Sequence, residues 1–288
     1  MPRRQAVQAM QAKPPRYGIW QALGGANLIS IPGERWEDGF SFLPEQCGQS
    51  GRSPIDCGLT DEFDTGDRPS SADGDPFVVF AGDECSTFGY QARDWVGRAT
   101  RQLAATRSFQ IAQEVWLGDV ASGGGNLPLT DPAGITVSSS PMSARKALAC
   151  LERAIGECCQ GCIGLIHMSP QVLTELAGLG NSIHLEGTSW VTPNGHVIIP
   201  DAGYDGSAPE GIAADPDSQW IYGTSMMGLR ASEVVVNPPS VDAAMAQMDR
   251  TVNTARVFAA QVVAVQWDQC CLFAAEVAVP PCDVGGGS

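Results

Sequence analysis

The longest helical pattern in the chain lies between residues 90 and 120. Its apolar positions recur at the spacing of a helix face, at Trp95, Leu103, Ile111, Val115 and Leu117. The intervening faces carry Arg93, Arg98, Arg101 and Arg107. No glycine or proline interrupts the stretch between Gly97 and Gly118, so we predict a helix from about residue 89 to residue 117. At roughly 1.5 Å per residue it would be about as long as a small domain is wide, and we expect it to be the spine of the fold.

Two shorter helices are predicted further along the chain. The first opens with Ser143 as a candidate N-cap. Its apolar face carries Leu148, Leu151, Ile155 and Cys158. The second has Ser169 as its cap and Pro170 at the first helical position, and it ends at Gly178 or Gly180.

Short runs rich in branched apolar residues predict the strands. Strands are expected within residues 76–83, 163–170 and 194–200, and in the two closing runs 254–268 and 271–279. A further pair is expected on either side of a turn around Met226, Met227 and Gly228. Residues 242–249 read as helix or loop. These helices and strands together predict the α+β class.

The first 80 residues differ from the rest. Residues 1–32 have mixed polarity and several turn residues, which is typical of an arm. Residues 33–76 hold many prolines, glycines and acids and show little periodicity. A loop of that length is unusual inside a compact domain unless it has a function, so we expect an extended excursion.

Charge is sparse and unevenly distributed. Only 17% of the 288 residues are charged, which suggests that much of the surface is buried against partners. Arg3, Arg4, Lys13 and Arg16 precede the first acid, whereas residues 34–75 hold eleven acids and three arginines. A basic arm beside an acidic segment suits docking between copies of one chain. A solvated tail beside a solvated loop is the alternative.

Composition excludes several classes of protein. The net charge of −15 and the pI near 4.4 argue against a general nucleic-acid binder. No secretory signal and no membrane-spanning segment are expected. The ten cysteines are therefore expected to be cytosolic and mostly reduced.

The histidines and cysteines do not predict a reactive site. None of His167, His184 and His196 has a metal-binding spacing; we expect a satisfied core position for His167 and surface positions for the other two. The sequence from Cys158 to Cys162 contains C-x-x-C, which binds zinc or forms a redox pair in other proteins. Zinc would need two more ligands, and the adjacent pair at 270 and 271 would point to opposite faces of a strand. We expect small packing residues, with a disulfide or metal staple as the alternative.

Other catalytic motifs are missing as well. The chain has no phosphate-binding loop of the Walker type and no nucleophile elbow, and it has only two lysines. The acid pairs Asp83–Glu84 and Asp215/Asp217 fit turn and cap roles. We therefore expect no enzyme activity, no cofactor and no metal.

The order of the predicted elements carries a resemblance. Five stretches carry it, over roughly residues 90–280: IAQEVWLGDVASGGGNLPL, ACLERAIGECCQGCIGLIHMSPQVLTELAGL, NGHVIIPDAGY, WIYGTSMMGLRASEVVV and RVFAAQVVAVQWDQCCLFAAEVAV. In this order the chain resembles the major capsid proteins of tailed double-stranded-DNA bacteriophages, whose Johnson fold is shared with encapsulin shells. The run from Glu114 to Gly118 followed by a Pro-Leu loop is the most specific match.

The resemblance implies a division of the chain. Residues 1–32 would be the N-terminal arm and residues 33–80 the extended loop. Residues 81–142 would hold the spine helix and part of the peripheral domain, and residues 143–249 the axial domain. Residues 250–288 would supply the closing strands of both domains.

The resemblance also implies a function. Copies of the chain would assemble as hexamers and pentamers into an icosahedral shell around packaged DNA, without sequence-specific DNA binding and without a membrane. Scaffold, decoration and portal proteins are further expected partners, and the location would be the virion after assembly in the host cytoplasm. We expect contacts between subunits at Arg3, Arg4, Lys13, Arg16, Arg93 and Arg101. The alternatives are an encapsulin-like compartment, another virion protein, or a thiol- or metal-dependent enzyme using the cysteine cluster.

Overall fold

The computed structural model describes residues 11, 13–27, 39–45, 71–86, 94–119, 126–138, 140–180 and 182–280. The chain divides into two compact units. The smaller unit comprises Met1–Pro15, Val78–Arg107 and Glu233–Gln261. The larger unit comprises Arg16–Phe77, Ser108–Ser232 and Val262–Ser288.

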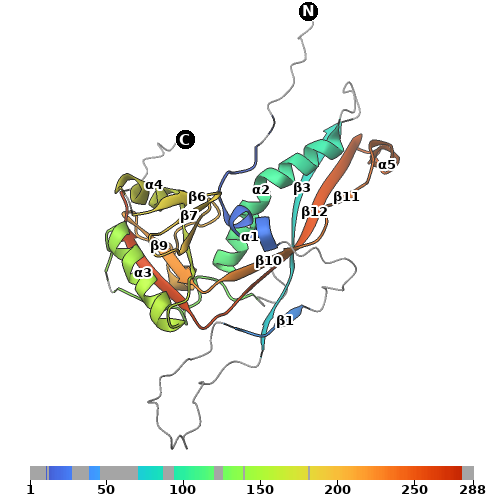
Figure 1. Ribbon diagram of the computed structural model, residues 1–288. Coiled ribbons are helices and arrows are strands. Elements are labelled where there is room, and N and C mark those ends of the chain that lie inside the picture. The colour runs from blue at the N-terminus through green and yellow to red at the C-terminus, as the bar shows by residue number, and fades with distance from the viewer. Residues whose placement is uncertain are drawn as a thin grey trace, which may run out of the picture. The chain divides into compact units, whose positions relative to one another are not determined.

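A mixed sheet of seven strands forms the centre of the larger unit (Figure 1). In spatial order the strands are β4 (Ile135–Thr136), β13 (Leu272–Ala278), β9 (Ser218–Thr224), β5 (Leu165–Met168), β8 (Val197–Pro200), β7 (Ser189–Val191) and β6 (His184–Glu186). The pairs β4–β13 and β5–β8 are parallel, and the others are antiparallel. All four residues of β5 are buried, which explains why this segment is continuously apolar apart from His167.

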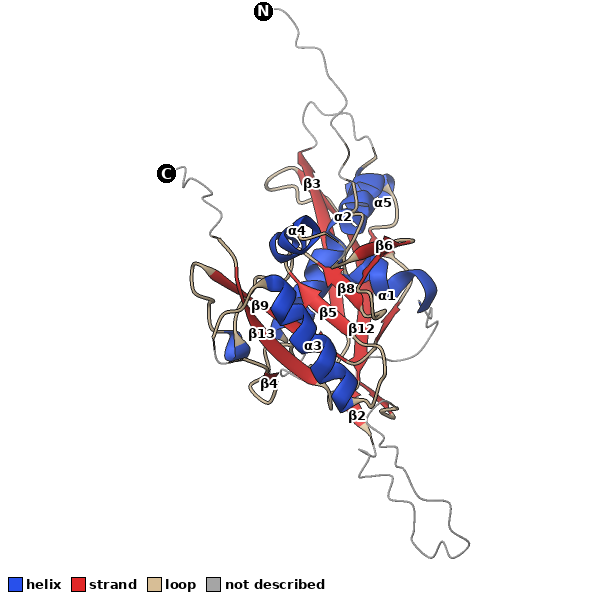
Figure 2. Ribbon diagram, turned by 60° about the vertical axis from the view of Figure 1, so that its left-hand side comes forward, coloured by secondary structure: helices blue, strands red, loops and turns tan. Residues whose placement is uncertain are grey.

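Two helices cover this sheet. Figure 2 shows helix α3 (Ala144–Cys158) lying across the strands, and helix α4 (Pro170–Gly178) follows β5 directly. The core beneath α3 includes Leu148, Leu151 and Ile155, as the helical spacing predicted. The cap positions are also as predicted: Ser143 precedes α3 without a side-chain hydrogen bond, and the Ser169 hydroxyl accepts from the backbone of α4.

One helix of the larger unit was not predicted. Residues Ile19–Asn27, inside the predicted arm, form helix α1. The side chains of Ile19, Trp20 and Leu23 are buried. The three apolar positions give too short a pattern to identify a helix from sequence, so its burial decides the structure.

The two strands expected on either side of Met226 belong to different sheets. Strand β9 pairs with β13 and β5, whereas β10 (Met227–Ala231) pairs with the end of β12 (Thr254–Trp267) in another sheet. The two strands therefore bracket the turn as predicted, but they do not pair with each other. The Ser225 hydroxyl donates to the backbone carbonyl of Asp268 at 2.7 Å, which fixes the point where the chain changes sheets.

The smaller unit is built on a second sheet. The first part of β12 pairs with β11 (Val235–Asn237) and with β3 (Phe77–Ser86), and helix α5 (Val241–Ala246) belongs to the same unit. Residues of β12 alternate between buried and exposed, as expected for a sheet with one face covered. The predicted strands at 76–83 and 254–268 are thus confirmed.

Helix α2 is the predicted spine. It spans Trp95–Leu117, 23 residues, and contributes to both units. Four of the five predicted apolar positions are buried, and Leu117 is half-buried. The helix begins at Trp95 because Asp94, with φ of 55°, has a left-handed backbone that a right-handed helix cannot include. In the described part of the chain, no helix is both long and apolar enough to cross a membrane.

Candidate assembly surfaces

The segment predicted as an extended loop has a paired root in the larger unit. Strands β1 (Phe40–Phe42) and β2 (Ala72–Gly74) are antiparallel, with Phe40 opposite Gly74 and Phe42 opposite Ala72. The described residues on the two sides of the segment therefore lie side by side. The sequence predicted a long loop here without this ladder, and residues 46–70 lie outside the described part.

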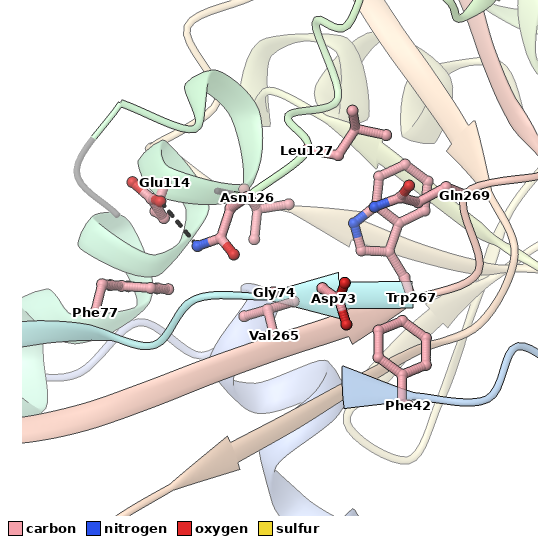
Figure 3. Close-up of a pocket in the computed structure, with 11 residues that line it drawn as sticks. Phe42, Asp73, Gly74, Phe77, Glu114, Asn126, Leu127, Val265, Trp267 and Gln269 are labelled. Carbon is pink, nitrogen blue, oxygen red and sulfur yellow. Dashed lines mark hydrogen bonds between the residues drawn. The ribbon is translucent and has the colours of Figure 1, made fainter. Parts of the chain in front are cut away.

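One asparagine ties this root to the end of the spine helix. The Asn126 side chain accepts from the backbone N–H of Asp75 and donates to its carbonyl, both at 2.9 Å. The same amide donates to the buried carboxylate of Glu114 at 3.1 Å (Figure 3). Glu114 belongs to the most specific sequence match, and its role here is to hold a loop rather than to react.

The structure also explains the glycine at the end of that sequence match, Gly118. Its φ of +65° ends the helix, and its N–H donates to the Glu114 carbonyl at 2.7 Å. A Cβ at this position would lie 2.8 Å from the carbonyl oxygen of Asn126. Because any other side chain would displace this loop, glycine is required here.

A small pocket lies beside the root (Figure 3). It is lined by Phe42, Asp73, Gly74, Phe77, Glu114, Val115, Asn126, Leu127, Val265, Trp267 and Gln269. The walls are mainly apolar, and the amide of Asn126 holds the Glu114 carboxylate. No histidine, cysteine or lysine is among the lining residues, so the pocket offers no general base or nucleophile of those kinds.

A second anchor holds the start of helix α1 within the larger unit. The buried carboxylate of Asp201 accepts from the Ile19 N–H at 3.0 Å and from the Ser108 hydroxyl at 2.7 Å. Gly18 has φ of +148°, and a Cβ there would lie 2.5 Å from the Ser108 oxygen. The backbone at Gly18 and Ile19 is therefore held close to Ser108 of the spine helix.

The six basic residues predicted to contact other subunits have different outcomes. Arg3, Arg4 and Arg93 lie outside the described residues. Lys13 and Arg16 are exposed, and the Arg16 guanidinium lies 5.3 Å from the ring centroid of Tyr17. Arg101 forms an ion pair of 2.9 Å with Asp94 of the same chain. Their contacts with other copies stay predictions.

The acid pair at Asp83 and Glu84 is not in a turn, so that prediction was wrong. Both residues lie in β3, where Asp83 pairs with Arg98 at 3.2 Å and Glu84 pairs with Arg256 at 2.8 Å. The pairs link β3 to α2 and to β12 within the smaller unit. The pair of Glu84 with Arg256 is exposed at both side chains and contributes about 0–1 kcal/mol, whereas the Asp83 side chain is only 11% exposed.

Two of the three histidines are buried. His167 lies 2.9 Å from the Tyr204 hydroxyl and 3.2 Å from that of Thr224, as expected for a satisfied core residue. Burial lowers its pKa to about 3. His196 was expected at the surface, but it is buried and its Nδ1 accepts from the N–H of Gly164 at 3.1 Å. His184 is exposed in β6, as predicted.

The cysteines match the alternative prediction of a disulfide staple and not the preferred one of small packing residues. Cys158 is disulfide-bonded to Cys271, and Cys159 to Cys162, so these residues are not reduced packing residues. Cys270 and Cys271 lie before β13, in a turn that brings both sulfurs toward Cys158. The sequence argument treated them as strand residues on opposite faces, and that assumption was wrong.

Known structures share this arrangement over nearly the whole chain. A structure from Mycobacterium phage Ogopogo matches 96% of this chain and 97% of its own, with a TM-score of 0.55 and 10% identity. The holo-SrpI encapsulin complex from Synechococcus elongatus PCC 7942 matches 95% and 93%, with a TM-score of 0.53 and 10% identity. The capsid of an empty GTA particle matches 97% of this chain and 96% of its own, with a TM-score of 0.53 and 11% identity.

Sequence comparison adds nothing to these matches, since no family model and no curated protein matches the chain. Because only about one residue in ten is identical between the chains, these matches show a shared fold and nothing further. The matches nevertheless span both compact units, and the helices and strands combine in the α+β manner that the sequence predicted. The chain therefore has the Johnson-type fold found in bacteriophage capsid and encapsulin structures.

Proposed function

We propose that this chain is a structural protein that self-assembles as capsomers into the icosahedral head shell of a tailed double-stranded-DNA bacteriophage. The observation that carries the proposal is a fold shared over 95% or more of the chain with phage, encapsulin and capsid structures. The anchored root of the extended segment supports it, since the root gives residues 43–71 a fixed base from which to reach another copy.

The proposal includes partners and location. The chain would associate mainly with itself, as hexamers and pentamers, and would enclose DNA without reading its sequence. Its net charge of −15 supports a wall that does not hold DNA tightly. Scaffold, decoration and portal proteins are further proposed partners, with assembly in the host cytoplasm and the virion as the final location. The boundaries of arm, loop, peripheral and axial domains given above belong to this proposal.

The experiment is to purify the full chain and observe it by light scattering and negative-stain electron microscopy. We expect capsomers or closed shells. Obligate interfaces bury about 2,000 Å² or more, so assembly should persist at micromolar concentration. A stable monomer across a range of salt, pH and protein concentration would disprove the proposal.

An encapsulin-like compartment is the second candidate, supported by the match to the SrpI encapsulin complex. The two functions differ in what the shell encloses. Particles isolated from the cells that encode the chain would protect double-stranded DNA from nuclease if the shell is viral. Particles that instead contain a stoichiometric second protein and no protected DNA would favour the compartment.

A further inference from the structure

Five cysteines meet where helix α3 ends. Cys158, Cys159 and Cys162 follow one another at the end of α3, and Cys270 and Cys271 come from the turn before β13. The sulfur atoms of Cys158, Cys270 and Cys271 all lie within 4.8 Å of one another. We propose that, once its disulfides are reduced, this cysteine cluster binds one zinc ion through Cys158, Cys270 and Cys271. This inference does not depend on the proposed function.

The sulfur positions suit a tetrahedral zinc site. With Zn–S bonds of about 2.3 Å, two ligand sulfurs lie about 3.8 Å apart. The sulfurs of Cys270 and Cys271 are 3.8 Å apart. After reduction, the Cys158 sulfur must withdraw from bonding distance of Cys271, and it lies within 4.8 Å of the Cys270 sulfur. Thiolate ligands select zinc over magnesium or calcium, which prefer oxygen. The fourth position remains for a water molecule or another thiolate.

The three ligands are held by elements that are already packed together. Helix α3 lies on β13 and β9. Leu151 and Ile155, about two turns and one turn before Cys158, are fully buried. Cys271 is fully buried, whereas Cys270 is exposed. The site therefore has a dry wall and an open side, so an ion can enter without unfolding the unit.

The helix end favours a cation over free thiolates. Cys158 is the last residue of α3, where the helix dipole presents partial negative charge. That charge disfavours an unpaired thiolate and attracts a divalent cation. A bound zinc ion compensates both the dipole and the thiolate charges, which gives the reduced cluster a reason to take up metal rather than to stay protonated.

The disulfides of the cluster must be reduced before zinc can bind. Cys158, Cys270 and Cys271 are all disulfide-bonded in this structure. Each disulfide takes two electrons from the reductant and becomes two thiols. A dithiol also supplies the two protons and is oxidised to a disulfide, whereas with a phosphine the protons come from water and the phosphine becomes its oxide. Zinc binding then releases the protons of the three ligand thiols to solvent. Cytosolic thiols supply such reduction in cells.

The test uses the full chain, reduced with a phosphine, incubated with zinc chloride and freed of excess metal by gel filtration. We expect elemental analysis to give one zinc per chain for the wild type. Cys271→Ser and Cys158→Ser should each lose at least tenfold in zinc affinity. Cys150→Ser is the matched control because Cys150 lies in the same helix and has a free thiol, and it should retain the metal. Cobalt in place of zinc should give a sulfur-to-cobalt charge-transfer band that disappears in the two ligand variants.

A second comparison uses only the wild-type protein, so it tests the inference even if the cysteine variants fail to fold. Wild-type protein that is fully oxidised should bind no zinc, while the same protein after reduction should bind it with an unchanged circular dichroism spectrum. No zinc in the reduced wild type, or equal zinc in reduced Cys271→Ser, would overturn the inference. Shell formation is scored separately by electron microscopy, so failure of the reduced protein to bind zinc would count against this inference and not against the proposed function.

Discussion

At the residue scale, His167 shows how the larger unit keeps a polar side chain in its core. The ring lies between the hydroxyl groups of Tyr204 and Thr224 and is fully buried. The Tyr204 ring in turn packs against Trp116 of the spine helix, with ring centroids 4.8 Å apart. Since two hydroxyl groups satisfy both ring nitrogens, the neutral imidazole is stable there and the charged form is not.

The pKa of His167 gives a prediction about pH. Its folded value of about 3 lies below the ordinary value of 6.5, so only the unfolded chain takes up a proton as the pH falls below 6.5. This contribution to stability is complete above pH 6.5 and is lost progressively toward pH 3, by about 2 kcal/mol at about pH 5. His167→Gln should remove this part of the pH dependence, measured by denaturant unfolding between pH 7 and 5. His184→Gln, at an exposed site, is the control and should retain it. Identical slopes in wild type and His167→Gln would contradict the assignment.

Asn126 gives a second prediction at this scale. Its amide makes three hydrogen bonds, two to Asp75 and one to Glu114. Asn126→Ala leaves the buried Glu114 carboxylate without this donor and should lower the free energy of unfolding by about 1–3 kcal/mol. Hydrogen exchange at the Asp75 amide should accelerate at the same time. Asn194→Ala, which removes an exposed contact with Glu152, is the control and should change neither quantity appreciably. Unchanged exchange at Asp75 in the Asn126 variant would show that the root is held by other contacts.

At the element scale, the sequence predicted the helices and strands whose positions depend on local patterns of apolar and capping residues. Helix α2, both closing strands and the caps of α3 and α4 follow from apolar spacing and end residues. Helix α1 was missed because its stability comes from burial and from the Asp201 carboxylate 182 residues away. The cysteine cluster was missed for a similar reason, since Cys158 and Cys271 meet only after α3 packs on β13. Contacts between distant segments have no signature within either segment.

The buried face of α2 allows a test of the spine. Leu103 is 1% exposed and lies in the smaller unit. Leu103→Ala removes buried methyl groups and leaves a cavity, so it should reduce the free energy of unfolding by about 2–5 kcal/mol. The adjacent Gln102 is exposed, and Gln102→Ala should change it by less than about 0.5 kcal/mol. Chemical denaturation of both variants makes the comparison. A Leu103→Ala protein as stable as the Gln102 control would mean that this face of α2 is not a packed spine.

At the scale of the whole molecule, a basic segment and an acidic segment follow one another along the chain. Four basic residues precede Gly18, and the acids are concentrated in residues 34–75. The root at β1 and β2 and the anchor at Asp201 both belong to the larger unit. Attraction between a basic segment on one copy and an acidic segment on another would favour assembly and would depend on salt.

The basic N-terminal segment supplies the assembly prediction. Replacing Arg3, Arg4, Lys13 and Arg16 together by Gln should leave the subunit folded, because α1 and its anchor begin after these positions. Shell yield, measured by light scattering, should fall at low salt and should depend less on salt than in the wild type, since the screened charge pairs are gone. Deleting residues 1–16 should have the same effect. Replacing Gln5, Gln8 and Gln11 by Ser is the control, because it changes three positions of the segment without changing its charge. If the four-fold variant assembles as well as this control at every salt concentration, the basic residues do not drive contacts between subunits.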